Sequence, residues 1–170
     1  MNRSRTKINS GQTLVELLIA MAVFSLIIGP FLSSLINLTA AQVRYRHRIQ
    51  AAQYAREELE IAYNIAVNAE AWEDFTNLVD PDNPEKPYHP SPTGVLAFDE
   101  GTELIGGIFT RETTFKKARR DDAGNVVDDE TATEDENTIK VVAKVSWRER
   151  GKDQEIVLTT YLMNFEFLGG

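Results

Sequence analysis

The stretch that decides the fold is residues 14–36, LVELLIAMAVFSLIIGPFLSSLI, which is apolar apart from Glu16 and a few small polar residues. No charged residue occurs between Glu16 and Arg44. A helix crosses a hydrocarbon core of about 30 Å with roughly 20 residues, so this stretch is long enough to span a membrane. The short basic peptide MNRSRTKINSGQ precedes it. The sequence therefore predicts a membrane-spanning helix behind a basic start.

Glu16 is the one acid inside this span. A carboxylate in mid-membrane costs about 2.5–3.5 kcal/mol on insertion scales, so such acids usually have an assigned partner. A basic start followed by an apolar run is also how a secretory signal peptide begins, and cleavage would then fall near Thr39-Ala40-Ala41. A signal peptide has no use for Glu16, and the helical pattern continues beyond Ala41. Both features favour a retained span.

Residues 10–16, SGQTLVE, followed by LLIA, resemble the cleavage and methylation signature of type IV prepilins and type II secretion pseudopilins. In that family a basic leader ends in Gly, a membrane peptidase cuts after it, the new N-terminus is methylated, and the fifth mature residue is Glu. The resemblance implies that Gly11 ends the leader, that Gln12 becomes the methylated N-terminus, and that Glu16 is the fifth mature residue. Gln12 departs from the usual Phe or Met, which bears on methylation more than on cleavage.

The resemblance also implies a role for Glu16 in assembly. In a filament its carboxylate would pair with the freed ammonium of Gln12, on a neighbouring subunit or its own, and so favour the correct axial register. Such a pair is worth more at low dielectric than in water. The alternative is an acid at the membrane boundary. Gly29-Pro30 is predicted to kink or melt one turn, either to let subunits lengthen and pack or as a tolerated kink without a role.

Partners and location follow from the same resemblance. The expected partners are other pilin or pseudopilin subunits, the prepilin peptidase/methylase, an inner-membrane assembly platform and the lipid bilayer. The chain would be a single-pass cytoplasmic membrane protein that later enters a surface or envelope filament, with its head outside the cytoplasm. The chain has no cysteine, which favours a minor pilin or pseudopilin over major pilins with a C-terminal disulfide loop. The alternative is a membrane-anchored or Sec-exported extracellular binding module.

Charge excludes several other functions. From Ile49 to the end there are 12 Lys+Arg and 25 Asp+Glu, a net charge of −13 against −8 for the whole chain. So acidic a body repels phosphate backbones and anionic lipid head groups, which argues against a nucleic-acid binder. Only His47 and His89 are present, and neither has a nucleophile or carboxylate motif beside it. We therefore expect no catalysis.

The helical pattern continues from the span as an amphipathic segment, residues 39–75. Its apolar positions follow three-four spacing and predict a seam against a sheet, with Arg56, Glu57, Glu58 and Glu60 mostly off the seam. The predicted seam positions are Ile49, Ala52, Ala55, Leu59, Ala62 and Ala66.

Residues 76–170 are expected to form a β-rich head behind this helix. Residues 80–92 hold five of the six prolines and predict a loop. Later residues alternate with a period of two, which predicts four antiparallel strands with one helix laid on a face, an α+β fold. The predicted strands are residues 95–98, 104–115, 139–148 and 156–162, with a turn at 149–153. The whole plan is a leader (1–11), an assembly helix (12–38), a stalk helix (39–75) and the head.

Residues 121–136 carry eight acids and no base, which predicts a long acidic hairpin loop. Dense like charge is usually solvated. Calcium binding is the alternative, because some pseudopilins bind that ion near their C-terminal loops; no other cofactor is expected. The calcium candidates are Asp128, Asp129, Glu130, Glu134, Asp135 and Glu136.

Overall fold

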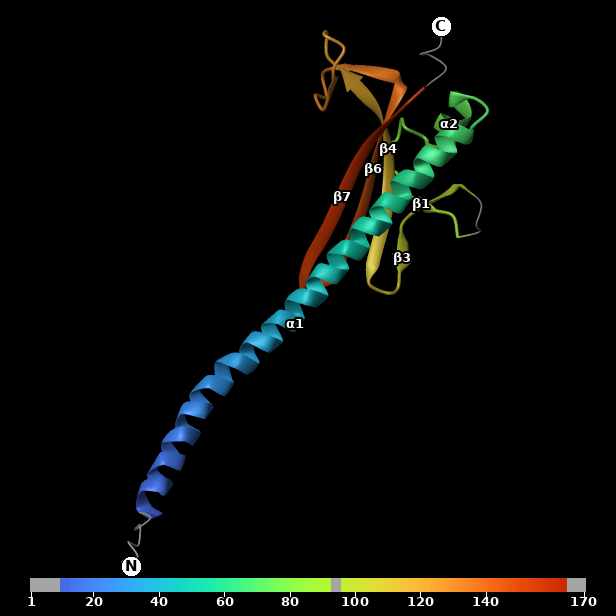
Figure 1. Ribbon diagram of the computed structural model, residues 1–170. Coiled ribbons are helices and arrows are strands. Elements are labelled where there is room, and N and C mark those ends of the chain that lie inside the picture. The colour runs from blue at the N-terminus through green and yellow to red at the C-terminus, as the bar shows by residue number, and fades with distance from the viewer. Residues whose placement is uncertain (1–9, 93–95, 165–170) are drawn as a thin grey trace, which may run out of the picture. The chain divides into compact units, whose positions relative to one another are not determined.

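The computed structural model describes residues 10–92 and 96–164. Helix α1 (Ser10–Asn68) is followed by a short helix α2 (Trp72–Val79) and an antiparallel sheet (Figure 1). The strands are β1 (Tyr88–Pro90), β2 (Phe98–Glu100), β3 (Glu103–Ile105), β4 (Phe109–Arg120), β5 (Val126–Val127), β6 (Thr133–Glu149) and β7 (Lys152–Met163). The α+β class is confirmed. The predicted number of strands is wrong, because the sheet has seven strands in this part of the chain.

The chain divides into two units, residues 1–45 and 46–170. Helix α1 contributes to both, so we call residues 14–45 the anchor segment and residues 46–164 the head. The predicted stalk helix does not reach residue 75, because α1 ends at Asn68 and α2 starts separately at Trp72. From residue 46 onward, α1 is part of the head rather than a separate stalk.

The three long strands lie side by side in the order β4-β6-β7, with β7 at the edge of the sheet. Along β6, Ile139, Val141, Ala143, Val145 and Trp147 are all buried, which confirms the predicted alternation. The hairpin turn between β6 and β7 also lies where the sequence predicted it. Its two central residues, Arg150 and Gly151, have φ values of 50° and 77°, and glycine supplies the second of these at little cost.

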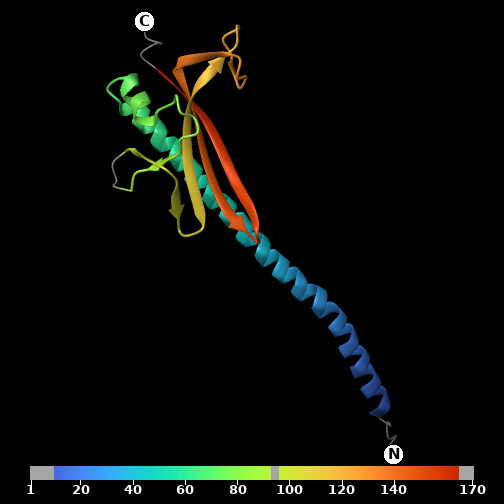
Figure 2. The ribbon, with the colours of Figure 1, turned by 180° about the vertical axis from the view of Figure 1, so that it is seen from behind.

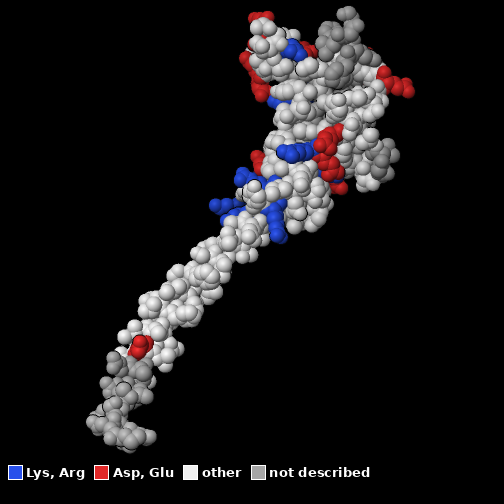
Figure 3. Space-filling model, viewed as in Figure 1, with Lys and Arg blue, Asp and Glu red and all other residues white. Residues whose placement is uncertain are grey.

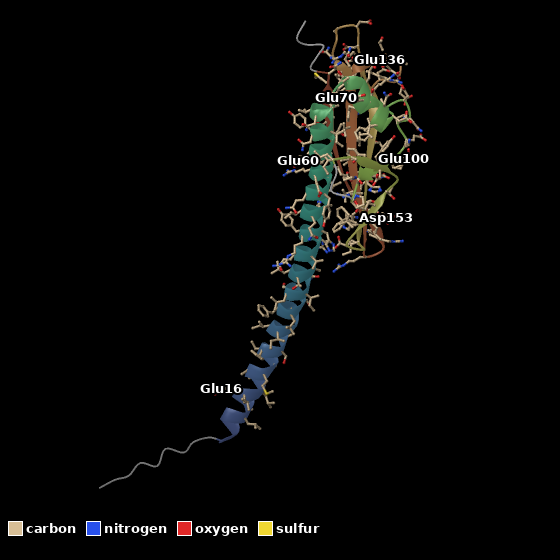
Figure 4. The ribbon with its side chains drawn as sticks, turned by 90° about the vertical axis from the view of Figure 1, so that its right-hand side faces the viewer. Glu16, Glu60, Glu70, Glu100, Glu136 and Asp153 are labelled. Atoms are coloured by element: carbon tan, nitrogen blue, oxygen red, sulfur yellow. The ribbon has the colours of Figure 1, made fainter. Side chains whose placement is uncertain are left out.

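The second half of α1 packs along one face of this sheet, as the views from behind and from the side show (Figures 2 and 4). The seam against the sheet is confirmed, but the prediction is wrong at two positions. Glu58, predicted off the seam, is fully buried, whereas the predicted seam residue Ile49 is 44% exposed. The buried positions, spaced by four and three, are Ala51, Ala55, Glu58, Ala62 and Ile65.

The short strands lie where the sequence predicted loops or longer strands. β1 lies inside the proline-rich stretch, and β2 begins at Phe98, where a strand was predicted to end. The predicted strand 104–115 is divided by Gly106 and Gly107, with φ values of 58° and 69°, into β3 and β4. Each of these short strands pairs through only about three residues, which is too short a segment for an alternating pattern to be recognised in the sequence.

Candidate membrane anchor and assembly segment

The anchor segment exposes large apolar side chains on all sides. Leu26 is 75% exposed, Phe24 64% and Ile36 69%. An 18-residue window in α1 has a mean hydropathy of 2.3, and none of it is buried. In Figure 3 this part of the helix is correspondingly white. Contiguous apolar surface of this kind is unfavourable in water, so length and composition fit a helix surrounded by lipid or by other apolar helices.

Glu16 lies on this apolar surface and is exposed (Figure 4). Within the described residues, no side chain forms a hydrogen bond or ion pair with its carboxylate. α1 includes Gly11 and Gln12, but the side chains of residues up to 13 lie outside the described part of the structure. Cleavage after Gly11, methylation of Gln12 and the pairing role of Glu16 therefore stay predictions.

Two hydroxyl groups of the anchor segment are satisfied within the helix. The Ser25 hydroxyl donates to the Met21 carbonyl oxygen at 2.8 Å, and Thr39 donates to Leu35 at 2.9 Å. Such bonds remove donors that lipid could not satisfy. Glu16, the one acid of the anchor segment, has no such partner among the described residues.

Gly29 and Pro30 both lie inside α1, which is helical throughout. No turn is melted here, although the ribbon curves along this part of α1 (Figure 1). A Cβ added at Gly29 would meet nothing within 4 Å. The use of this pair as a kink in assembly stays a prediction.

Residues 6–32 match a family model described as the prokaryotic N-terminal methylation motif. This is the prepilin-type cleavage and methylation motif of type IV pilins and pseudopilins, so the predicted resemblance is confirmed. The chain therefore carries a prepilin-type motif at the start of a long apolar helix, and proteins with this motif are structural rather than enzymatic. Comparisons with curated proteins and with solved structures give no match.

The head contains a polar site that sequence periodicity missed. Glu58 is fully buried, and its Oε1 lies 3.8 Å from Nε of Arg111, which is itself buried in β4. Arg111 pairs more closely with Glu103, at 2.6 Å, and reaches Glu57 at 3.6 Å. Neither carboxylate oxygen of Glu58 has a hydrogen-bond partner among the described residues. Its spacing from Ala55 and Ala62 was the available signal, but a carboxylate at that position is normally expected to face water.

Burial changes the protonation of Glu58. Loss of water raises its pKa from the ordinary value of 4.5 to about 8, and the nearby Glu57 and Glu103 act in the same direction. The Thr113 hydroxyl and the Arg111 guanidinium oppose the shift without cancelling it. A buried carboxyl is expected to stay protonated when its ion pair is long and shared. Glu58 is thus neutral at neutral pH.

The acidic segment is not one long loop, because β5 and the start of β6 lie within it. Its acids engage separate partners rather than a common centre. Glu134 pairs with Arg119 at 2.9 Å, Asp135 with Arg120 at 2.6 Å, and Glu136 with Lys117 at 2.8 Å. No three His, Asp or Glu side chains in the described residues could hold a metal ion. The candidate calcium ligands are therefore not brought together.

The individual acids of this segment have local reasons to stay ionised. A hydrogen bond from Lys140 lowers the pKa of Asp128, and bonds from Thr131 lower that of Asp129. At Asp135, burial acts to raise the pKa, but hydrogen bonds from Thr138 and Arg120 outweigh it and the pKa is lowered. These acids act as ion-pair and turn partners at one end of the sheet.

The two histidines lie on different elements. His47, in α1, packs edge-on against Phe109 with ring centroids 5.7 Å apart. His89, in β1, has Nδ1 3.0 Å from the Pro90 carbonyl oxygen. They do not form a shared site.

Proposed function

We propose that this chain is a minor pilin or pseudopilin, a structural subunit of a type IV pilus-like or type II secretion-like filament. A prepilin peptidase removes residues 1–11, and the subunit waits in the membrane until it joins the filament through its anchor segment. The observation that carries the proposal is the match of residues 6–32 to the prepilin-type motif at the start of an exposed apolar helix.

The anchor segment explains why assembly is favourable. Burying one Leu, Ile or Phe side chain stabilises by about 1.5–3 kcal/mol relative to water. The exposed apolar side chains of this segment must therefore be covered, first by lipid and then by the same segments of neighbouring subunits. Removing the anchor from lipid without such neighbours would be strongly unfavourable, so extraction and assembly are coupled.

Glu16 then sets the axial register between neighbouring subunits. In lipid its carboxylate is poorly solvated, and an ammonium group at Gln12 of a neighbouring subunit would compensate it. A subunit shifted along the filament axis would leave both charges unpaired at low dielectric. We propose that this penalty selects the correct stagger between subunits.

The processing step is tested by mass spectrometry of the protein purified from the membranes of its native host. The expected N-terminus is Gln12, with or without a methyl group. Gly11→Val is expected to leave residues 1–11 attached, because the peptidase of this family requires Gly before the cut. Gly29→Ala is the matched control, since it changes a glycine of the same helix outside the cleavage site.

Two other N-termini would contradict the proposal. A chain that begins at Gln42 would have been cut by signal peptidase, which points to an exported binding module. A chain that keeps residues 1–11 would be an unprocessed single-pass membrane protein.

A further inference from the structure

The charges of the head are separated along the sheet. The strand register pairs Phe109 with Trp147 at one end of the β4–β6 ladder, and Arg120 with Thr133 at the other. The ladder is regular over the nine residues from Phe109 to Lys117, about 30 Å, before a bulge at Ala118, so these two ends are far apart. Residues 121–136, with eight acids and no base, join the strands at the Arg120 end.

The opposite end is basic, and we call it the basic end, residues 46–48 and 148–153. His47 of α1 contacts Phe109, and Phe109 contacts Trp147, so α1 enters the head beside the β6–β7 turn. Figure 3 shows Lys and Arg side chains gathered where α1 enters the head. The basic end has five cations and two carboxylates, a net charge of +3: Arg46, Arg48, Arg148, Arg150 and Lys152 against Glu149 and Asp153.

Four of these five cations have no ion pair among the described residues. Arg46, Arg48, Arg150 and Lys152 are exposed, and none of them has an ion pair with another described residue. Arg148 approaches Asp153 only to 3.7 Å, with both side chains mostly exposed. By contrast, Arg111, Lys117 and Arg120, further along the sheet, each pair with a carboxylate.

Chain connectivity keeps the start of the head close to the apolar run. Only seven residues separate Leu38, at the end of the apolar run, from Arg46, and helix α1 continues through them. Helical residues advance about 1.5 Å each, so the first cations of the head lie within about 12 Å of the apolar run. No particular angle between anchor and head is needed for this.

We propose that the basic end of the head binds anionic phospholipid head groups while the subunit waits in the bilayer. The net acidic composition predicts repulsion from such a surface. Charges interact strongly only within a Debye length of about 8 Å, however, so the charge of the end that lies nearer the lipid determines whether the head is attracted. The acidic end, about 30 Å or more away along the ladder, would be repelled. The inference rests on the proposed anchoring, and adds that lipid charge draws the basic end of the head to the membrane surface.

The test uses the full chain in vesicles. Because the chain has no cysteine, Gln154→Cys can carry a donor dye beside the basic end, and Ala123→Cys can carry it in the acidic segment. Energy transfer is measured to an acceptor on lipid head groups, in phosphatidylcholine vesicles with and without phosphatidylglycerol. We expect transfer from position 154 to rise about twofold or more with phosphatidylglycerol, and the rise to disappear at about 1 M salt. Transfer from position 123 stays low.

A charge variant assigns the effect to the basic end. Replacing its five cations with Gln should abolish the rise, whereas Arg56→Gln with Lys116→Gln, two exposed cations elsewhere on the head, should keep it. Co-flotation with the vesicles reports anchoring separately. Flotation with equal transfer in both vesicle types overturns the inference and leaves the anchor standing. Equal transfer from the neutralised variant and the wild type also overturns it, and failure to float overturns the anchoring itself.

Discussion

Helix α1 passes through two environments, and the comparison between its halves explains the molecule. In the anchor segment Leu26 is 75% exposed, whereas in the head Ala55 is fully buried. The first half is apolar all round, and the second presents small residues to a sheet and polar residues to water. The same secondary structure therefore leaves an apolar surface uncovered in one half and packs closely against a sheet in the other. Composition around the helix, rather than helical propensity, distinguishes them.

The largest expected effect compares two Phe→Ala changes. Phe115 lies among the rings of Phe75, Tyr88 and Phe98 in the head, so Phe115→Ala should lower the free energy of unfolding by about 3–5 kcal/mol. Phe24→Ala, in the anchor segment, should leave it unchanged. Denaturant unfolding of the full chain in detergent micelles, followed by tryptophan fluorescence, measures both. Equal losses of unfolding free energy for the two variants would contradict the difference in packing between the head and the anchor segment.

Protonation of Glu58 gives the next largest effect. Its folded pKa is raised to about 8, so the folded state keeps a proton that the unfolded chain releases near 4.5. The stabilisation is complete below the unfolded pKa and is lost as the pH rises through 8. Wild type should lose about 3 kcal/mol between pH 5 and 8 through this group.

Glu58→Gln stays neutral and should lack this slope, so its stability relative to wild type should rise with pH over that window. Unfolding curves at several pH values check this. Glu60→Gln, an exposed acid of the same helix, is the matched control and should follow wild type. Parallel pH profiles for Glu58→Gln and wild type would show that Glu58 is ionised in the folded state.

Close packing in the head is tested by enlarging an alanine. Ala55→Leu adds a bulky side chain against the sheet and should cost about 1–3 kcal/mol of unfolding free energy. Ala22→Leu, on the exposed surface of the anchor segment, should cost nothing measurable. The same unfolding assay compares the pair, and tolerance at Ala55 would mean that α1 lies further from the sheet than described.

The smallest effect is expected at Gly29. Gly29→Ala should change the unfolding free energy of the head by less than about 0.5 kcal/mol, because an added Cβ meets nothing within 4 Å and the residue lies outside the head. The measurement is again unfolding in micelles. A larger loss would mean that the anchor segment contributes to the stability of the head.

The sequence predicted the parts of the molecule that repeat a simple pattern. The unbroken apolar run made the span predictable. The alternation of apolar and polar residues along β6 and β7 made the hairpin predictable, and the three-four spacing of apolar residues in α1 made the seam against the sheet predictable. The motif around Glu16 was recognisable because Gly, Glu and the apolar run occur at set distances.

The rest depends on contacts between distant residues. Glu58 lies on the seam by its spacing from Ala55 and Ala62, but a carboxylate is expected on the exposed face, and its distant neighbour Arg111 becomes visible only in the structure. Ile49 is apolar but lies off the helix face that carries the buried Ala51 and Ala55, and so it stays exposed. Residues 121–136 were predicted to form a solvated loop, with calcium binding as the alternative. Strand pairing instead gives four of the eight acids separate basic partners: Asp128, Glu134, Asp135 and Glu136.

The most direct test of the central claim compares two acids of α1, Glu16 in the anchor segment and Glu60 in the head (Figure 4). Each is replaced by Ala, and the filaments of the native host are quantified by electron microscopy and by the subunit content of sheared filaments. The account predicts that Glu16→Ala removes the subunit from filaments while it remains in the membrane, and that Glu60→Ala assembles like wild type. Normal incorporation of Glu16→Ala would contradict it.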